Sequence, residues 1–305
     1  WLARKVGGAI SRSRIQKLAR EGHLADKAGA AVSDTARRVS AGEAFRLGMA
    51  PRDCEKPPVP ENLPLDILYE DDDIIVINKA AGMVIHRGNG VENGTLVNAL
   101  LYHTSGRLSS IGIEAGRQGI VHRLDKDTSG AMVACKSDAA HIAMYKMFEK
   151  HLVRRDYTAL VWGSPQPKKG VIKRNIARNP RFWAEMRVVV EGGKEAVTHY
   201  DTIKTFTRAS IVRCNLETGR THQIRVHMKF TGTPIIGDAT YGMDNKFVRS
   251  IADAEERRAM AAAGRQMLHS STISFSHPVS GKPVELEAPM PNDMLKLIDF
   301  LNRRA

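Results

Sequence analysis

Apolar residues between positions 65 and 305 occur in short runs that polar turns separate. The runs at 72–79 (DDIIVINK), 132–136 and 156–162 (DYTALVW) have the length of buried strands. Apolar positions at helical spacing predict helices at 95–103, 138–151, 221–230 and 293–304, and further strands are expected at 185–190, 196–206 and 209–217. Strands and helices that follow one another without regular alternation indicate an α+β fold.

The first 50 residues predict a small basic unit. Residues 11–21 (SRSRIQKLARE) place Ile15 and Leu18 on one helical face, and Gly22 follows where a helix often ends. Short strands with turns at 27–29 and 41–43 are expected after the helix. Such a charged face is usually only solvated, but the near absence of acidic residues favours an anionic partner. The cations on that face are Arg12, Arg14, Lys17 and Arg20.

Residues 51–64 (PRDCEKPPVPENLP) contain five prolines. Proline fixes its own φ and restricts the residue before it, so this composition predicts a stiff, extended linker. The sequence therefore divides into a basic unit at 1–50, a linker at 51–64 and a main domain at 65–305. Because the chain begins WLARKVG, we expect the basic unit to be truncated at its N-terminal end.

The 305 residues carry a formal net charge of +13. An excess of this kind says nothing about the fold, but it produces a positive field that suits a polyanion. A membrane-surface protein would need a basic amphipathic helix with a bulky apolar face, and the sequence shows none. Nucleic acid is therefore the favoured partner.

The three cysteines, Cys54, Cys135 and Cys214, are far apart and form no CxxC pair. This spacing argues against a zinc site and a disulfide framework, and it fits a reducing compartment. No apolar stretch is long enough to cross a membrane. We expect a bacterial cytoplasmic protein, with an organelle matrix as the alternative, because residues 1–20 also have the composition of a transit peptide.

Residues 119–130 (GIVHRLDKDTSG) concentrate polar side chains between two apolar runs. A structural turn would not require two carboxylates, two cations and an imidazole in six positions, and catalytic groups are often found in loops on a rigid scaffold. A carboxylate beside a cation stays ionised and can act as a nucleophile in glycosidic chemistry. Asp125 and Asp127 are both candidates, and spacing does not choose between them.

Residues 217–228 (ETGRTHQIRVHM) form a second polar cluster. On a helix that starts near Thr221, Arg225 projects beside Thr221, with His222 close by. A polar helix face is the simplest interpretation. His222 and His227 do not have the spacing that would align two metal ligands on one face, so we expect no metal site.

Three segments together resemble the RluA-type pseudouridine synthases: HRLDKDTSG, RDYTALVWG and ETGRTHQIRVHM, in this order. Shorter stretches, such as NGTLVNALLYH and GTPIIGDATYG, extend the resemblance over essentially the whole chain. It is strongest to members that act on large-subunit ribosomal RNA. The resemblance implies an α+β fold in which helices flank a mixed, largely antiparallel central sheet.

The basic unit resembles the S4 RNA-binding domain, through SRSRIQKLAREGHL followed by RRVSAGEAFRL. That resemblance implies that the helix and the loop after it hold RNA phosphates. The cations of the helix would then be RNA-binding residues.

The family resemblance also implies residue roles that spacing leaves open. It selects Asp125 rather than Asp127 as the catalytic carboxylate, and it makes Tyr157, which alone would suggest strand packing, the active-site tyrosine. Arg225 would pair with Asp125. Arg123 would hold the target nucleotide out of its helix, and the residues that line the RNA cleft would include His222 and Gln223.

The expected partner is large-subunit ribosomal RNA or a pre-ribosomal particle. We expect a monomer that needs no metal, nucleotide or redox cofactor. Two alternatives stay open: a non-catalytic RNA-binding assembly factor on the same scaffold, and an enzyme of the same class that acts on transfer RNA.

Overall fold

The computed structural model describes residues 2–5, 12–48, 57–88, 90–242 and 244–304. The chain divides into two compact units, residues 1–56 and 57–305, and each is described by itself. The division falls inside the proline-rich segment. Cys54 lies outside the described residues, whereas Cys135 and Cys214 are free and buried.

The N-terminal unit combines two short helices with a two-stranded antiparallel sheet. Leu18 and Ala19 of the second helix are buried, as are Leu24 and Val32 beyond it. The helix predicted at 11–21 is confirmed, and it extends over Arg12–Arg20. Its sequence contains Arg14 and Lys17 between these two arginines, and Arg20 is exposed. The S4-like assignment of this unit stays a prediction. Its elements are α1 (Leu2–Lys5), α2 (Arg12–Arg20), β1 (Leu24–Asp26) and β2 (Phe45–Leu47).

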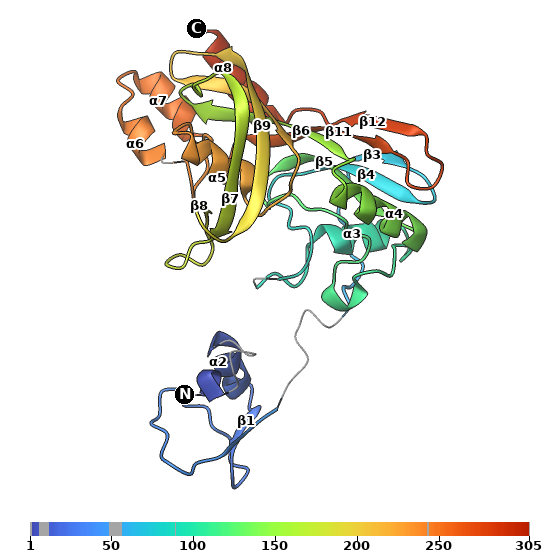
Figure 1. The fold of residues 1–305 in the computed structure, drawn as a ribbon, viewed down its shortest axis with the longest axis vertical. Helices are drawn as coiled ribbons and strands as arrows, with labels where there is room; N and C mark the ends of the chain where they lie inside the picture. Colours follow the sequence, from blue (N-terminus) through green and yellow to red (C-terminus); the bar gives the residue numbers. More distant parts are fainter. Residues whose placement is uncertain (1, 6–11, 49–56, 89, 243, 305) are drawn as a thin grey trace. The chain divides into compact units, whose positions relative to one another are not determined.

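A 10-stranded sheet forms the centre of the second unit among the described residues, in the order β3-β4-β5-β11-β6-β10-β9-β7-β8, with β12 beside β11 (Figure 1). In that part of the chain, β5 and β11 pair in parallel, and every other pairing is antiparallel. The strands are β3 (Ile67–Glu70), β4 (Ile74–Lys79), β5 (Ser129–Cys135), β6 (Arg154–Trp162), β7 (Lys169–Arg178), β8 (Met186–Val189), β9 (Lys194–Thr205), β10 (Ala209–Leu216), β11 (Leu268–Ser276) and β12 (Pro283–Glu287).

At the end of the sheet that contains β4 and β5, α3 and α4 lie beside the strands (Figure 1) and belong to different core clusters. Ile75 and Ile77 of β4 join the core cluster that includes α3, whereas Ile74 and Val76 join the cluster that includes α4. Successive strand residues face opposite sides, so the continuous apolar run at 74–77 buries β4 on both faces. The helices are α3 (Leu96–His103), α4 (Asp138–Glu149), α5 (Gln223–Phe230), α6 (Asp244–Arg249), α7 (Ala254–Ala261) and α8 (Asn292–Asn302), with a short 3-10 helix at Ile113–Ala115.

Side-chain caps fix where two of these helices begin. Thr95 and Asn98 form a reciprocal capping box at the start of α3, and the Ser137 hydroxyl accepts a hydrogen bond from the Ala140 amide at the start of α4. The helix expected at 221–230 begins two residues later, at Gln223, because His222 has φ +57° and lies outside it. Thr221 and Arg225 therefore do not share a helical face.

The second half of the proline-rich segment is tied to α3. The Asn98 side chain donates to the Val59 carbonyl at 2.6 Å, and the Glu61 amide donates to the Asn98 carbonyl at 3.0 Å. The Glu61 carboxylate accepts from the Gly94 amide. Residues 57–64 thus form part of the second unit and do not serve as a free linker.

The α+β fold is confirmed, but several elements have no counterpart among the expected ones. They are the strands β3, β7, β11 and β12 and the helices α6 and α7. β7 alternates exposed cations with a few buried positions, and β11 buries polar residues such as His269 and Ser270. Neither segment has the apolar run that marks β4. Within the described residues, no helix is both long and apolar enough to span a membrane.

We expect Gly130→Ala to lower the free energy of unfolding by about 2–5 kcal/mol. Gly130 has φ +113°, and a Cβ there would lie 2.2 Å from the Ser270 carbonyl oxygen, at the parallel β5–β11 pairing. Urea unfolding measures the change. Gly264→Ala is the matched control, since a Cβ there meets no atom within 4 Å, and it should change stability by less than about 0.5 kcal/mol. Equal effects of the two substitutions would contradict this packing.

Candidate active site

Asp125, Tyr157 and Arg225 line one cavity of the second unit. Asp125 lies in the loop before β5, Tyr157 lies on β6 and Arg225 lies on α5. The sheet order brings these segments together, because β5 and β6 both pair with β11. The other lining residues come from the same loop, from β6 (Arg155), from residues 216–224 and from β11.

A buried arginine of this cavity pairs with two carboxylates. Arg225 Nη1 donates to Asp125 Oδ2 at 3.0 Å, while its Nε and Nη2 donate to the two oxygens of Asp238 at 2.6 and 2.9 Å. The Arg225 side chain is 8% exposed. Burial tends to lower the pKa of Arg225, but Asp238 and then Asp125 raise it overall, so the guanidinium stays charged. Two oriented charge-assisted pairs fix the position of the Asp125 carboxylate.

The geometry separates Asp125 from Asp127. Asp125 lines the cavity and pairs with Arg225, whereas Asp127 does not line it. Among the described residues, the Asp127 carboxylate forms no ion pair, and its carbonyl accepts a hydrogen bond from Arg265 at 2.9 Å. The backbone of the loop is thus anchored at Asp127, and the carboxylate directed into the cavity is that of Asp125.

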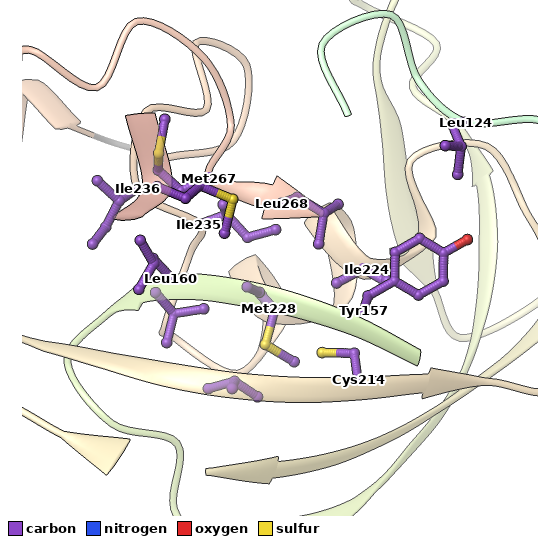
Figure 2. Close-up of a cluster of buried hydrophobic side chains, with 14 of the residues drawn as sticks. Leu124, Tyr157, Leu160, Cys214, Ile224, Met228, Ile235, Ile236, Met267 and Leu268 are labelled. Carbon is purple, nitrogen blue, oxygen red and sulfur yellow. The ribbon is translucent and has the colours of Figure 1, made fainter. Parts of the chain in front are cut away.

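Tyr157 lies at the boundary between the apolar core and the cavity. Figure 2 shows its ring at one end of the buried cluster, with the hydroxyl directed away from Leu160 and Met228. The residue is 5% exposed. Burial raises the pKa of the Tyr157 hydroxyl, while Arg155 and a hydrogen bond with Ser270 oppose the rise. The hydroxyl is therefore protonated at neutral pH.

His222 and Gln223 both line the cavity but differ in how many of their polar atoms are already hydrogen-bonded within the protein. His222 Nε2 is 4.0 Å from Asp125 Oδ1, and its Nδ1 is 2.8 Å from the Tyr241 hydroxyl. Burial lowers the pKa of His222, although Asp125 opposes this, so the ring is neutral at pH 7. The Gln223 amide makes all four of its hydrogen bonds within the protein, with Val197, Thr198, Thr218 and Arg220. Its role here is to hold the loop before α5.

The comparisons with known proteins identify the family of this chain. The model of the RNA pseudouridylate synthase family matches residues 73–230, which include Asp125, Tyr157 and Arg225. The ribosomal large subunit pseudouridine synthase D of Zymomonas mobilis is 42% identical over 294 residues, which cover 96% of this chain and 90% of the relative. The chain belongs to the RNA pseudouridylate synthase family.

Other relatives extend the agreement. The ribosomal large subunit pseudouridine synthase D of Nitrosomonas europaea is 40% identical over 95% of this chain and 80% of its own length. Among solved structures, human RNA pseudouridylate synthase domain containing 4 superposes with a TM-score of 0.60 at 23% identity, over 78% of this chain and 93% of that one. The latter likeness shows the fold alone. The α+β fold with its mixed, largely antiparallel sheet is thus the pseudouridine synthase fold. Pseudouridine synthases are isomerases, and this chain is one of them.

One residue that supports the loop of this synthase was missed in the sequence. Lys79 at the end of β4 is 1% exposed, and its Nζ donates to the carbonyls of Ala80, Met83 and Lys126 at 2.7–3.0 Å. Burial lowers the pKa of Lys79 to about 7, an effect that Asp127 and Asp125 oppose. The Lys126 carbonyl belongs to the loop of Asp125, so Lys79 joins β4 to the active site. A lysine at the end of an apolar run was the only signal in the sequence.

One described cluster has the composition of a metal site, formed by Asp71, Asp73 and His277. None of the three lines the active-site cavity. Asp71 accepts hydrogen bonds from the Tyr69 hydroxyl and from two backbone amides, and it pairs with His277 Nε2 at 2.8 Å. The carboxylate is thus occupied by local partners and serves the β3–β4 turn.

We expect Asp238→Asn to lower the free energy of unfolding of the synthase by about 3 kcal/mol, because it breaks a buried ion pair with Arg225. Urea unfolding measures the change. Asp201→Asn is the matched control: it breaks the exposed pair with Arg213, which should be worth about 0–1 kcal/mol. Equal stability of the two variants would contradict a stabilising role of the buried pair between Arg225 and Asp238.

Proposed function

We propose that this pseudouridine synthase isomerises specific uridines of large-subunit ribosomal RNA, with Asp125 as the catalytic carboxylate. The ion pair between Asp125 and Arg225 in the cavity carries the catalytic assignment. The relatives named for the ribosomal large subunit, about 40% identical over nearly the whole chain, support the choice of RNA. Their bacterial origin supports a bacterial cytoplasmic enzyme.

The reaction exchanges one bond of the sugar for another. The bond from C1′ to N1 of uracil breaks, the free base turns, and C1′ bonds to C5. C5 then loses its proton, and N1, released from the sugar, gains one, so the net change moves one proton from C5 to N1. The Asp125 carboxylate can serve either of two routes, attack on C1′ or assistance to a glycal of the sugar, and both require it to be ionised. Arg225 donates a hydrogen bond to the carboxylate and directs it.

Tyr157 is suited to hold the uracil while it is detached. Its ring lines the cavity beside the apolar core and offers a face for stacking, and its protonated hydroxyl can move a proton during the exchange at C5. No step of this sequence changes the oxidation state of the substrate. We therefore expect catalysis without a metal, nucleotide or redox cofactor.

The target uridine must leave its stacked position to reach Asp125. Extruding a base costs about a few kcal/mol, which phosphate contacts offset. Arg123 is exposed and lines the cavity beside Leu124, a position from which it can hold the nucleotide out of its helix. The net charge of +13 suits ribosomal RNA or a pre-ribosomal particle, and the synthase is expected to act as a monomer.

We expect Asp125→Asn to abolish pseudouridine formation while RNA binding is retained, because the amide keeps the shape of the side chain without its charge. Carbodiimide labelling of ribosomal RNA, from cells with the wild-type protein, the variant or neither, maps the affected uridines. A filter-binding assay reports the affinity for the same RNA.

Asp127→Asn is the matched control for that experiment, since Asp127 lies two residues away and outside the cavity lining. It should retain most of the product. Product from Asp125→Asn would overturn the assignment of Asp125. Binding without product from the wild-type protein would support an assembly factor, and product in transfer RNA alone would support a tRNA enzyme.

We expect deletion of residues 1–50 to weaken RNA binding and reduce its salt dependence, while residues 65–305 stay folded. The two compact units and the cations of α2, including the exposed Arg20, support this expectation. Binding titrations at several salt concentrations measure the effect, and circular dichroism checks the remaining fold. Unchanged affinity and salt dependence would remove the case for an RNA-binding N-terminal unit.

A further inference from the structure

A second cavity of about 510 Å³ adjoins the active-site cavity. Its lining includes Phe148, His151 and Glu217, and none of these lines the first cavity. Four residues line both cavities and form their shared wall: Arg123, Arg155, Gly219 and Arg220. Three of the four are arginines, so positive charge gathers where the two cavities meet.

Arg155 is the most unusual member of this wall. It lies two residues before Tyr157 on β6, so the two side chains share a face of the strand. Arg155 is 6% exposed, yet it forms no ion pair with any carboxylate of the described residues. Its Nη2 reaches the Leu216 carbonyl at 3.4 Å, and its buried Nε has no hydrogen-bond partner.

A buried guanidinium without a counter-ion is costly. The ring of Phe148, with its centroid 5.2 Å from Arg155 Cζ, provides only a cation–π contact. The nearby Glu217 carboxylate is paired with His199 instead. The fold therefore keeps a positive charge at the cavity wall that the protein itself does not neutralise, which is the arrangement expected where a ligand supplies the anion.

Gly219 keeps that charge accessible. A Cβ at position 219 would lie 3.1 Å from Arg155 Nη1, closer than ordinary van der Waals contact. The missing side chain leaves room beside the guanidinium on the cavity side. Arg220, the next residue, is held by a hydrogen bond from its Nε to the Glu195 carbonyl at 2.9 Å.

We propose that this wall, centred on Arg155, binds a phosphodiester next to the target uridine, while the neighbouring nucleotide occupies the second cavity. In RNA one phosphodiester joins each nucleoside to the next, so a uridine in the first cavity and its neighbour in the second place that linkage at the shared wall. The second cavity has the volume of a site for a small ligand, about 300–1,000 Å³. The inference deepens the proposed function and rests on it.

The test pairs a protein change with an RNA change. The RNA is a stem-loop that spans a uridine mapped in ribosomal RNA, with either flanking phosphodiester replaced in turn by an uncharged methylphosphonate. Arg155→Gln should weaken binding of the unmodified RNA about 10- to 100-fold and reduce the salt slope by about one charge. One methylphosphonate should weaken wild-type binding by a similar factor, and it should weaken Arg155→Gln by less than about 3-fold.

Arg154→Gln is the matched control. Arg154 is the preceding residue on β6, and its side chain is 67% exposed. It pairs with Asp156 and lines neither of the two cavities. That variant should remain sensitive to the methylphosphonate by the full factor. Full sensitivity in Arg155→Gln, or insensitivity of the wild-type protein to both linkages, would overturn the proposal.

A second variant guards against misfolding of Arg155→Gln. Gly219→Ala retains the arginine but narrows the space beside Nη1, and it should weaken binding of the unmodified RNA more than of the methylphosphonate RNA. Thermal unfolding is measured for both variants to check that they fold. Equal losses of affinity for the two RNAs in Gly219→Ala would contradict the proposal. Failure of the proposed function would look different, because the wild-type protein would then leave the stem-loop uridine unconverted.

Discussion

The Arg225 guanidinium holds the candidate active site together, because it is buried between Asp238 on one side and Asp125 on the other. Each partner comes from a different part of the chain, and none of the charges is well solvated. Removing Arg225 would leave two carboxylates without their partner in a medium of low polarity, and removing Asp238 would leave Arg225 with Asp125 alone. Ile224 and Met228 anchor α5 in the main core, so the position of Asp125 is coupled to the packing of the whole second unit.

The loop of Asp125 is held from the opposite side by backbone contacts. Lys79 reaches the Lys126 carbonyl from β4, and Arg265 reaches the Asp127 carbonyl from the segment before β11. Because β4 is buried on both faces, its end cannot shift without disturbing two core clusters. Side-chain charge thus aims the carboxylate, and backbone hydrogen bonds to buried cations fix the loop that carries it. The role proposed for Asp125 requires such preorganisation, because one carboxylate would act at a single sugar carbon.

The sequence revealed those parts of the fold in which local pattern and tertiary environment agree. The apolar run of β4 is an example, whereas β11 buries polar side chains whose partners lie elsewhere in the chain and was missed. The site shows the same division. A crowded polar loop marked Asp125 and Asp127 as candidates, but only the resemblance to a family, and then the contact with a helix 100 residues away, distinguished them. Asp238 gave no local signal, because its importance arises entirely from the arginine that it contacts.

Charge is balanced differently at the two places where the RNA would meet the enzyme. At Arg225, one guanidinium is shared by the two carboxylates of Asp125 and Asp238, so the charge of Asp125 is only partly neutralised. At the adjoining wall, Arg155 has no carboxylate partner among the described residues. A polyanionic substrate suits both places, because the carboxylates would repel its phosphates and the arginines of the wall would attract them. The same charges that leave the wall unneutralised in the protein would therefore direct the sugar, and not the phosphate, toward Asp125.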